Sequence, residues 1–475
     1  MPDEKTADTK QVEETTVKSQ HHITINGQEI RYWATAGTML LKEEDGTEKA
    51  AIYYTAYTRQ GVDDLSQRPI TFAFNGGPGS SSVWLHLGCL GPRRVQLERD
   101  GQPLPPPGEL VDNDCSILDQ TDLVFIDPVS TGFSRAVPGQ EESDYHKFES
   151  DISSVAEFIQ RYTSRNKRWH SAKYLAGESY GTTRAAGLAK HLQMRDGIYL
   201  NGIVLISAVL HFQSICFDYG NDLPFVLFLP SYAATAWHHG CLDPTLGGLA
   251  DVLARAEAFC RGPYSQALFA GSALNVERRQ EIVAELATLT GLSQAYIERT
   301  DLRINIHRFT KELLRERQQT VGRFDSRIMG RDRDDAGELY EYDPSYANVQ
   351  GGYTAALNQY LRAELGFASE LPYEILTGRV QPWDYQKFQN QYVDVTEGLR
   401  QAMMQNPSLR LLIANGYYDL ATPYFATEYT VNHMGLPVDQ KDRLRMTYYP
   451  AGHMMYTDPG SLLKLKADLD AFYGG

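Results

Sequence analysis

Gly177-Glu178-Ser179-Tyr180-Gly181 follows a short apolar run, residues 173–176, and precedes a helix-like segment, residues 182–190. A Gly-x-Ser-x-Gly pattern between a strand and a helix is typical of a nucleophile elbow, a sharp turn that holds a serine hydroxyl out into a cleft. The flanking glycines relieve crowding where the backbone turns. Because 39 of the 475 residues are glycine, a chance match is not rare. The pentapeptide alone therefore also fits a serine in a surface turn, and the other motifs must decide.

Length and composition indicate an ordinary globular protein. A chain of 475 residues can bury a large core, and its 42% hydrophobic and 22% charged residues are typical values. The net charge of −15 argues against a nucleic-acid partner, because no cluster of Lys and Arg is available to bind phosphate. We interpret the acidity as a feature that favours solubility, and the sequence leaves the oligomeric state open.

The cysteines and the amino-terminal residues indicate the cellular compartment of the protein. The odd number of cysteines and the absence of a C-x-x-C pair favour a reducing environment and offer no zinc site, so we expect neither a metal nor a cofactor. Residues 1–8 lack the basic start and apolar run of a signal peptide, and no stretch approaches the ~20 apolar residues that span a bilayer. We expect a cytoplasmic protein without a membrane partner, or a periplasmic or secreted one if a signal has been removed.

The order of the predicted elements indicates the fold class. Residues 1–20 are polar and are expected to form a disordered tail, followed by hairpins around Asn26-Gly27 and Asp45-Gly46. Buried strands then alternate with amphipathic helices, which predicts an α/β fold with a mostly parallel sheet flanked by helices. We expect residues 21–210 and 391–475 to form the two parts of this core. Residues 211–390, rich in helix-like stretches, are expected to form a large helical cap inserted between them.

Two further residues follow predicted strands in an order that favours catalysis. Asp419 and His453 each lie just after a strand, at the edge where open α/β sheets place catalytic groups. With Ser179 they give the order nucleophile, acid, base of an α/β-hydrolase triad. A serine hydroxyl needs a histidine to take its proton and a carboxylate to orient that histidine. Alone, Asp419 also fits a turn and His453 a structural role, but the combination favours a catalytic triad.

Donors for a developing oxyanion are available next to the serine. The backbone N–H of Tyr180 is one, and the glycine-rich loop at residues 75–79, which follows the buried strand at 69–74, offers a second. Glu178 beside the nucleophile would oppose an oxyanion if ionised, so we expect it to bind substrate. A protonated Glu178 would donate a hydrogen bond to a substrate carboxylate. The alternative is a supporting carboxylate bonded to backbone.

Five motifs together resemble the serine carboxypeptidase family, peptidase family S10 of the α/β-hydrolase clan. They are FNGGPGSSS at 74–82, PVSTGFS at 128–134, GESYG at 177–181, NGYYD at 415–419 and AGH at 451–453. The resemblance implies a triad of Ser179, Asp419 and His453, with oxyanion N–H groups from Gly77 and Tyr180. It also implies that the substrate carboxylate and leaving residue contact four residues: Asn75, Gly76, Glu178 and Met454.

The chain departs from the family pattern at three positions. Ser80 stands where many members have a disulfide-bonded cysteine, which indicates a bacterial-type member without the usual disulfides. Thr182 replaces a frequent glycine. Cys89 stands about where the family commonly has a second glutamate beside the carboxylate site, so Glu178 has less reason to stay protonated.

The sequence therefore predicts a metal-independent serine hydrolase that releases carboxyl-terminal residues from peptides through an acyl-enzyme. The first alternative is a carboxylesterase on the same scaffold, favoured by Cys89, since an ester substrate needs no carboxylate clamp. Acyl transfer to another nucleophile is also open to any acyl-enzyme. A remote alternative is an inactive hydrolase fold that binds partners, which would predict a damaged triad or oxyanion site.

Overall fold

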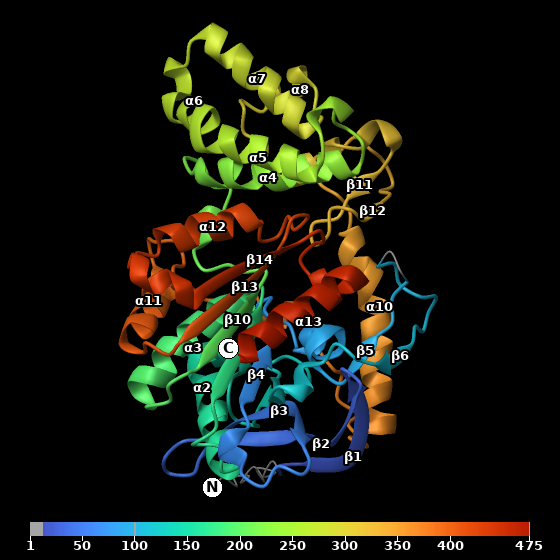
Figure 1. Ribbon diagram of the computed structural model, residues 1–475, viewed down its shortest axis with the longest axis vertical. Helices are drawn as coiled ribbons and strands as arrows, with labels where there is room; N and C mark the ends of the chain where they lie inside the picture. The colour runs from blue at the N-terminus through green and yellow to red at the C-terminus, as the bar shows by residue number, and fades with distance from the viewer. Residues whose placement is uncertain (1–12, 99–100, 475) are drawn as a thin grey trace, which may run out of the picture.

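The computed structural model describes residues 13–98 and 101–474, and its centre is one large twisted sheet (Figure 1). Its strand order is β1-β2-β3-β7-β4-β9-β10-β13-β14, with β8 (Arg135–Ala136) paired to β3. The nine strands of the path are β1 (Thr16–Ile25), β2 (Gln28–Lys42), β3 (Glu48–Arg59), β4 (Ile70–Phe74), β7 (Asp122–Ile126), β9 (Lys173–Glu178), β10 (Gly202–Ile206), β13 (Arg410–Gly416) and β14 (Leu444–Tyr449).

Strands β7 to β14 of this path run parallel, whereas β1, β2 and β3 form an antiparallel meander that joins the sheet through β7. The parallel strands β4, β7, β9 and β10 are buried along their whole length, as expected for a sheet covered on both faces. The predicted hairpin at Asn26-Gly27 joins β1 to β2, and both turn residues have positive φ. The α/β-hydrolase class predicted from the sequence is confirmed.

The predicted disordered tail is too long. Residues 1–12 lie outside the described residues, but Thr16 to Gln20 belong to β1 and pair with Gly37 to Trp33 of β2. Most of these β1 side chains are exposed or half-buried, so their sequence carries no apolar alternation. Strand formation here depends on the long partner strand and could not be read from local composition.

Helices cover both faces of the sheet. One face packs on α2 (Phe148–Arg165), α3 (Tyr180–Arg195) and α11 (Thr396–Gln405), and the other on α13 (Pro459–Gly474) and α10 (Pro344–Gln359). Each face contributes its own cluster of buried apolar side chains. The two-sided cover leaves the carboxyl ends of the parallel strands as the place where the site loops meet.

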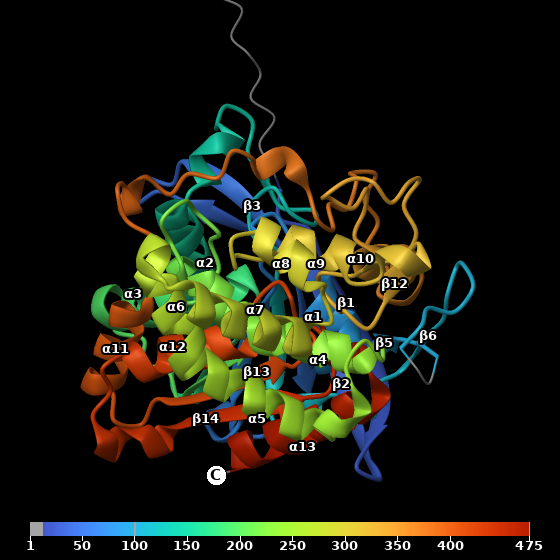
Figure 2. The same cartoon turned by 90° about the horizontal axis from the view of Figure 1, so that it is seen from above.

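A helical cap forms a third apolar cluster. Figure 1 shows its helices as a layer above the sheet, and Figure 2 shows that layer lying over the core. The helices are α4 (Leu223–His238), α5 (Leu249–Phe259), α6 (Ser265–Ala270), α7 (Val276–Thr290), α8 (Gln294–Arg299) and α9 (Ile306–Glu312). The same cluster includes side chains of α12 (Tyr424–His433), so the cap rests on a core helix.

The carboxyl-terminal part of the predicted cap packs differently. Apolar side chains of α10 and of residues 360–375 belong to the cluster on the sheet face, and Figure 1 shows α10 running along the side of the core. We therefore propose that the cap comprises residues 211 to about 343 and that residues 344–390 are part of the core layer.

No helix among residues 13–98 and 101–474 is long and apolar enough to cross a membrane. All five cysteines are free thiols in the structure: Cys89, Cys115, Cys216, Cys241 and Cys260.

One buried ion network at the far end of the sheet from the site allows a stability prediction. The Asp122 carboxylate accepts from Arg68 Nε at 2.7 Å and from Arg168 Nη1 at 2.5 Å, and all three side chains are buried. Asp122→Ala leaves two buried guanidinium groups without their carboxylate, so we expect a loss of about 3–5 kcal/mol, measured as a shift of the urea midpoint. Asp112→Ala removes an exposed partner of Arg93 and serves as the control, with an expected loss below about 1 kcal/mol. Equal shifts for both variants would contradict the argument.

Candidate active site

Ser179 sits at a sharp turn between β9 and α3. Its backbone has φ 60° and ψ −130°, outside the usual regions for a residue with a side chain. A Cβ on Gly177 would overlap the carbonyl of Gly181, and a Cβ on Gly181 would overlap that of Phe74. The glycines at both positions are therefore required by close backbone packing, and the serine is held in the conformation of a nucleophile elbow.

Asp419 and His453 are hydrogen-bonded to each other. His453 Nδ1 lies 2.8 Å from Asp419 Oδ2, and both side chains are buried. The second Asp419 oxygen accepts from the backbone N–H groups of Ala421 and Thr422 at 2.7 and 2.9 Å. The Thr422 hydroxyl donates to Oδ2 at 2.8 Å. Asp419 is thus fully bonded and fixed toward the imidazole.

Burial disfavours the charged form of His453, but the Asp419 carboxylate more than offsets it. The pKa of His453 is raised above its ordinary value by Asp419 and, to a lesser extent, by Glu178. A positive imidazole formed when the serine loses its proton is therefore stabilised in place.

Seven of the predicted site residues line one cavity of about 370 Å³: Asn75, Gly76, Gly77, Glu178, Ser179, His453 and Met454. Asp419 contacts His453 and is not itself among the residues that line the cavity. Tyr180 begins α3 directly after the serine. The cavity is also lined by Trp84, by Tyr346 of α10 and by Arg323 and Phe324 of the cap. The structure therefore brings together residues that lie at or just after the carboxyl ends of strands β4, β9, β13 and β14.

Three backbone N–H groups beside the serine are available to a ligand. Among residues 13–98 and 101–474, the amides of Gly76, Gly77 and Tyr180 donate to no carbonyl or side chain. Gly76 packs so closely on the elbow that a Cβ there would overlap the Tyr180 nitrogen. The glycine-rich loop and the helix start thus present unpaired donors at one place, the arrangement that an oxyanion requires.

Glu178 lines the cavity and is buried, with a relative exposure of 3%. Burial raises its pKa to about 7, although the charge of His453 and hydrogen bonds from Tyr456 and Asn75 favour the ionised form. The Tyr456 hydroxyl donates to Glu178 Oε2 at 2.7 Å. A carboxyl group with a pKa near 7 is available as a hydrogen-bond donor in neutral or mildly acidic solution.

Burial raises the pKa of the Cys89 thiol, and the nearby Glu178 charge raises it further, so Cys89 lies in the same buried region as Glu178. A Cβ on Gly88 would overlap the Tyr456 ring, so the small residues at 88 and 89 leave the space that Tyr456 occupies. Tyr456 was not predicted from the sequence, because nothing local marks a tyrosine three residues after the histidine as a partner of Glu178.

A buried ion pair between Arg184 and Asp151 connects the helix that follows the elbow to helix α2. Arg184 of α3 donates through Nε to both Asp151 oxygens at 3.0 and 2.9 Å, and through Nη1 to the Asn75 carbonyl at 2.5 Å. The Tyr180 hydroxyl donates to the same Asp151 carboxylate at 3.3 Å. The elbow helix, α2 and the glycine-rich loop are therefore tied to one another through Arg184, whose relative exposure is 1%.

A segment of the cap is bonded directly to both triad loops. The Phe324 carbonyl accepts from the backbone N–H of His453 at 2.5 Å, and the Arg323 carbonyl accepts from the backbone N–H of Leu420 at 3.0 Å. The Phe324 ring stacks on the His453 ring with centroids 5.1 Å apart. The cap therefore contributes to the shape of the site, a contribution that no motif in residues 211–390 reveals.

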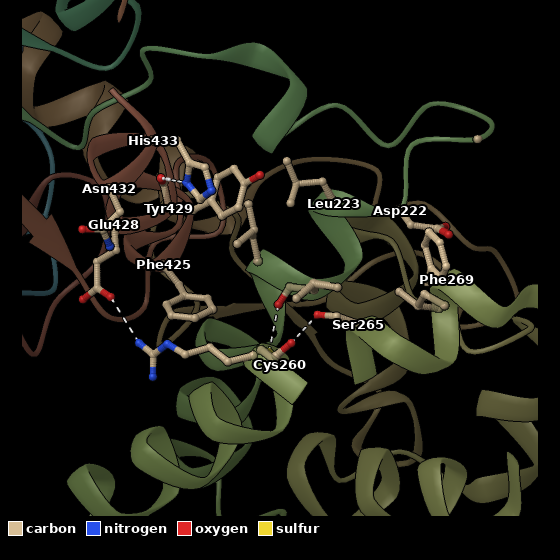
Figure 3. Close-up of a pocket in the computed structure, with 15 residues that line it drawn as sticks. Asp222, Leu223, Cys260, Ser265, Phe269, Phe425, Glu428, Tyr429, Asn432 and His433 are labelled. Carbon is tan, nitrogen blue, oxygen red and sulfur yellow. Dashed lines mark hydrogen bonds and ion pairs between the residues drawn. The ribbon is translucent and has the colours of Figure 1, made fainter. Parts of the chain in front are cut away.

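A second, larger cavity of about 680 Å³ lies between the cap and α12 (Figure 3). Phe425, Glu428 and His433 of α12 face Leu223, Cys260 and Phe269 of the cap across it. None of its 15 lining residues belongs to the triad or to the glycine-rich loop. Among the described residues, no group of three or more His, Cys, Asp or Glu side chains is arranged to hold a metal. The candidate chemistry is therefore assigned to the smaller cavity.

Comparison with known proteins places the chain in a family. The model of the serine carboxypeptidase family matches residues 35–458. The pheromone-processing carboxypeptidase KEX1 of Saccharomyces cerevisiae is 31% identical over 156 residues, which are 30% of this chain and 20% of that protein. The protein of the same name from Leptosphaeria maculans is 28% identical over 156 residues, 32% of this chain and 22% of that protein. The match thus spans about a fifth of the length of these curated relatives.

The crystal structure of the Saccharomyces cerevisiae prohormone-processing carboxypeptidase KEX1 is similar in fold. It aligns with 93% of this chain and 91% of its own, at 16% identity and a TM-score of 0.57. The family match extends from strand β2 to Asp458, five residues after His453, and so includes every predicted site residue. The chain belongs to the serine carboxypeptidase family.

Proposed function

We propose that this protein releases carboxyl-terminal residues from peptides through an acyl-enzyme formed on Ser179. The observation that carries the proposal is the single cavity in which Ser179 and His453 lie beside Asn75 and Glu178. A nucleophile and its base thus adjoin groups that can hold a free carboxylate. Every triad position and both oxyanion positions are present, which argues against an inactive binding module.

The chemistry follows from the geometry. Ser179 Oγ attacks the carbonyl carbon of the last peptide bond while His453 Nε2 takes its proton and Asp419 holds Nδ1–H. The oxyanion receives the N–H groups of Gly77 and Tyr180. Collapse breaks the C–N bond, His453 returns the proton to the leaving amine, and an ester on Ser179 remains. Water then attacks this ester with His453 as base, which frees the shortened peptide and the serine hydroxyl.

Recognition of the terminal carboxylate is assigned to three groups that line the cavity. The Asn75 amide, the Gly76 N–H and protonated Glu178 supply three donors to it. Asn75 is fixed because its Oδ1 accepts from the Leu85 N–H at 3.0 Å, which leaves its NH₂ group facing Glu178. Met454, the residue after His453, borders the space for the leaving residue.

The cytoplasmic location remains a prediction.

Cys89 favours one alternative function, that of a carboxylesterase. A carboxylesterase needs no carboxylate clamp, and the position that would reinforce Glu178 with a second carboxyl holds a thiol. Tyr456 argues for the peptidase, since its hydroxyl holds one Glu178 oxygen and leaves the other for Asn75 and substrate.

Three matched substrates separate the two activities. They are an N-blocked dipeptide with a free carboxylate, the same dipeptide amidated, and a short-chain aryl ester, each assayed with the wild type and Ser179→Ala. We expect kcat/KM for the free dipeptide to exceed that for the amide by about 10²-fold or more, because two or three charge-assisted hydrogen bonds are lost with the carboxylate. All turnover should disappear in Ser179→Ala. Ester cleavage without peptide cleavage would assign the protein as a carboxylesterase, and no Ser179-dependent turnover would support a binding role.

The pH dependence of peptide binding tests Glu178 and Tyr456. Protonated Glu178 donates to the substrate carboxylate, so KM for the free dipeptide should rise as the pH increases through about 7, the pKa of Glu178. The Tyr456 hydroxyl stabilises the ionised form, so Tyr456→Phe should raise that pKa and move the rise in KM to higher pH. A hydrogen bond to a charged group contributes about 1.5–3 kcal/mol, which corresponds to about one to two pH units.

Tyr353→Phe is the matched control, since this buried hydroxyl near Gly88 makes no hydrogen bond to Glu178 among the described residues. Its KM profile should coincide with that of the wild type, and the profile for the aryl ester should not move in either variant. A flat KM from pH 5 to 9, or equal shifts in both variants, would remove the proposed role of Glu178.

A further inference from the structure

Arg323 is held at the cavity by its backbone. Its carbonyl accepts from Leu420, the residue after Asp419, and its N–H donates to Asp343 Oδ1 at 3.1 Å. The next residue, Phe324, bonds and stacks against His453. The position of Arg323 is therefore fixed relative to the triad, although the residue belongs to the cap.

The Arg323 guanidinium is a cation without a carboxylate partner. Within residues 13–98 and 101–474 it makes no ion pair and no side-chain hydrogen bond, and it lies over the Phe324 ring at 5.4 Å. Its neighbour Arg327 is different, because Asp325 and Asp458 bind that guanidinium. A half-buried arginine on an aromatic ring, with its donors free, is positioned for an anionic ligand.

The other side chains that line the cavity are mostly aromatic, aliphatic or uncharged polar groups. Trp84, Tyr346 and Phe324 form a chain of ring contacts, with centroids 6.0 and 6.2 Å apart, that ends at His453. Glu178 is the only carboxylate among the lining residues, and Tyr456 already holds it. Asn75, Glu178 and Arg323 line the same cavity, so a leaving residue whose α-carboxylate is bound by Asn75 and Glu178 shares that cavity with the Arg323 guanidinium.

We propose that Arg323 determines specificity by binding the side-chain carboxylate of an acidic terminal residue, glutamate or aspartate, in the leaving position. The inference rests on the proposed carboxypeptidase function. The α-carboxylate is not the expected ligand of Arg323, because Asn75, the Gly76 N–H and Glu178 are already proposed as its donors. The charge of Arg323 also acts on His453, beside which the leaving residue must lie.

Four N-blocked dipeptides that differ only in the last residue test this proposal: Glu, Gln, Leu and Lys. For the wild type we expect kcat/KM for Glu to exceed that for Gln by about 10-fold or more, since a charge-assisted pair contributes about 1.5–3 kcal/mol. Arg323→Gln should bring this Glu/Gln ratio close to one. Arg323→Glu should reverse the preference toward Lys.

Arg331→Gln is the matched control, because Arg331 belongs to the same cap, is exposed and bonds Gln318 outside the cavity. It should keep the wild-type ratio. A Glu/Gln ratio near one in the wild type, or a ratio retained in Arg323→Gln, would overturn the proposal. An equal loss for all four peptides would also overturn it, since Arg323 would then bind the α-carboxylate. Failure of the wild type to cleave any free dipeptide, with ester cleavage intact, would instead reject the carboxypeptidase function.

Discussion

The backbone of Ser179 is held in a conformation that a serine would not adopt by itself, and the site is built on that constraint. A residue at φ 60° and ψ −130° costs of order 1–3 kcal/mol and persists only where its surroundings determine it. In this protein, the conformation of Ser179 is determined by the backbone segments packed against it. Gly177 and Gly181 allow strand β9 and helix α3 to meet, and Gly76 allows the glycine-rich loop to rest against the first turn of α3. The hydroxyl and the unpaired N–H groups are thereby set at a common point.

Two sets of interactions fix the remaining parts around this point. The Arg184–Asp151 pair joins α3 and α2, and its additional bond to the Asn75 carbonyl fixes the loop that carries the proposed oxyanion and carboxylate donors. The cap segment at Arg323 and Phe324 bonds to the loops that carry Asp419 and His453. Residues separated by hundreds of positions in the chain therefore depend on one another, and the cap lines the same cavity as Ser179 and His453.

The sequence predicted those features whose cause is local. Ser179, Asp419 and His453 could be proposed because each follows a predicted strand, and parallel strands bring such positions to one edge. Tyr456 and Arg323 could not be found, because their roles depend on which side chain lies opposite after folding. The same reason explains Thr16 to Gln20, which form a strand only through pairing with β2, and α10, whose helical pattern does not tell whether it packs on the cap or on the core.

The central claim is that Ser179 is a nucleophile activated by His453 and Asp419. Labelling with a fluorophosphonate, followed by mass spectrometry of the intact protein and of its peptides, tests this claim without any assumption about the substrate. The account predicts one adduct per chain, located on Ser179, absent in Ser179→Ala and formed at least about 10²-fold more slowly in His453→Ala. An unlabelled wild-type protein, an adduct at another residue, or labelling that does not depend on His453 would contradict the account.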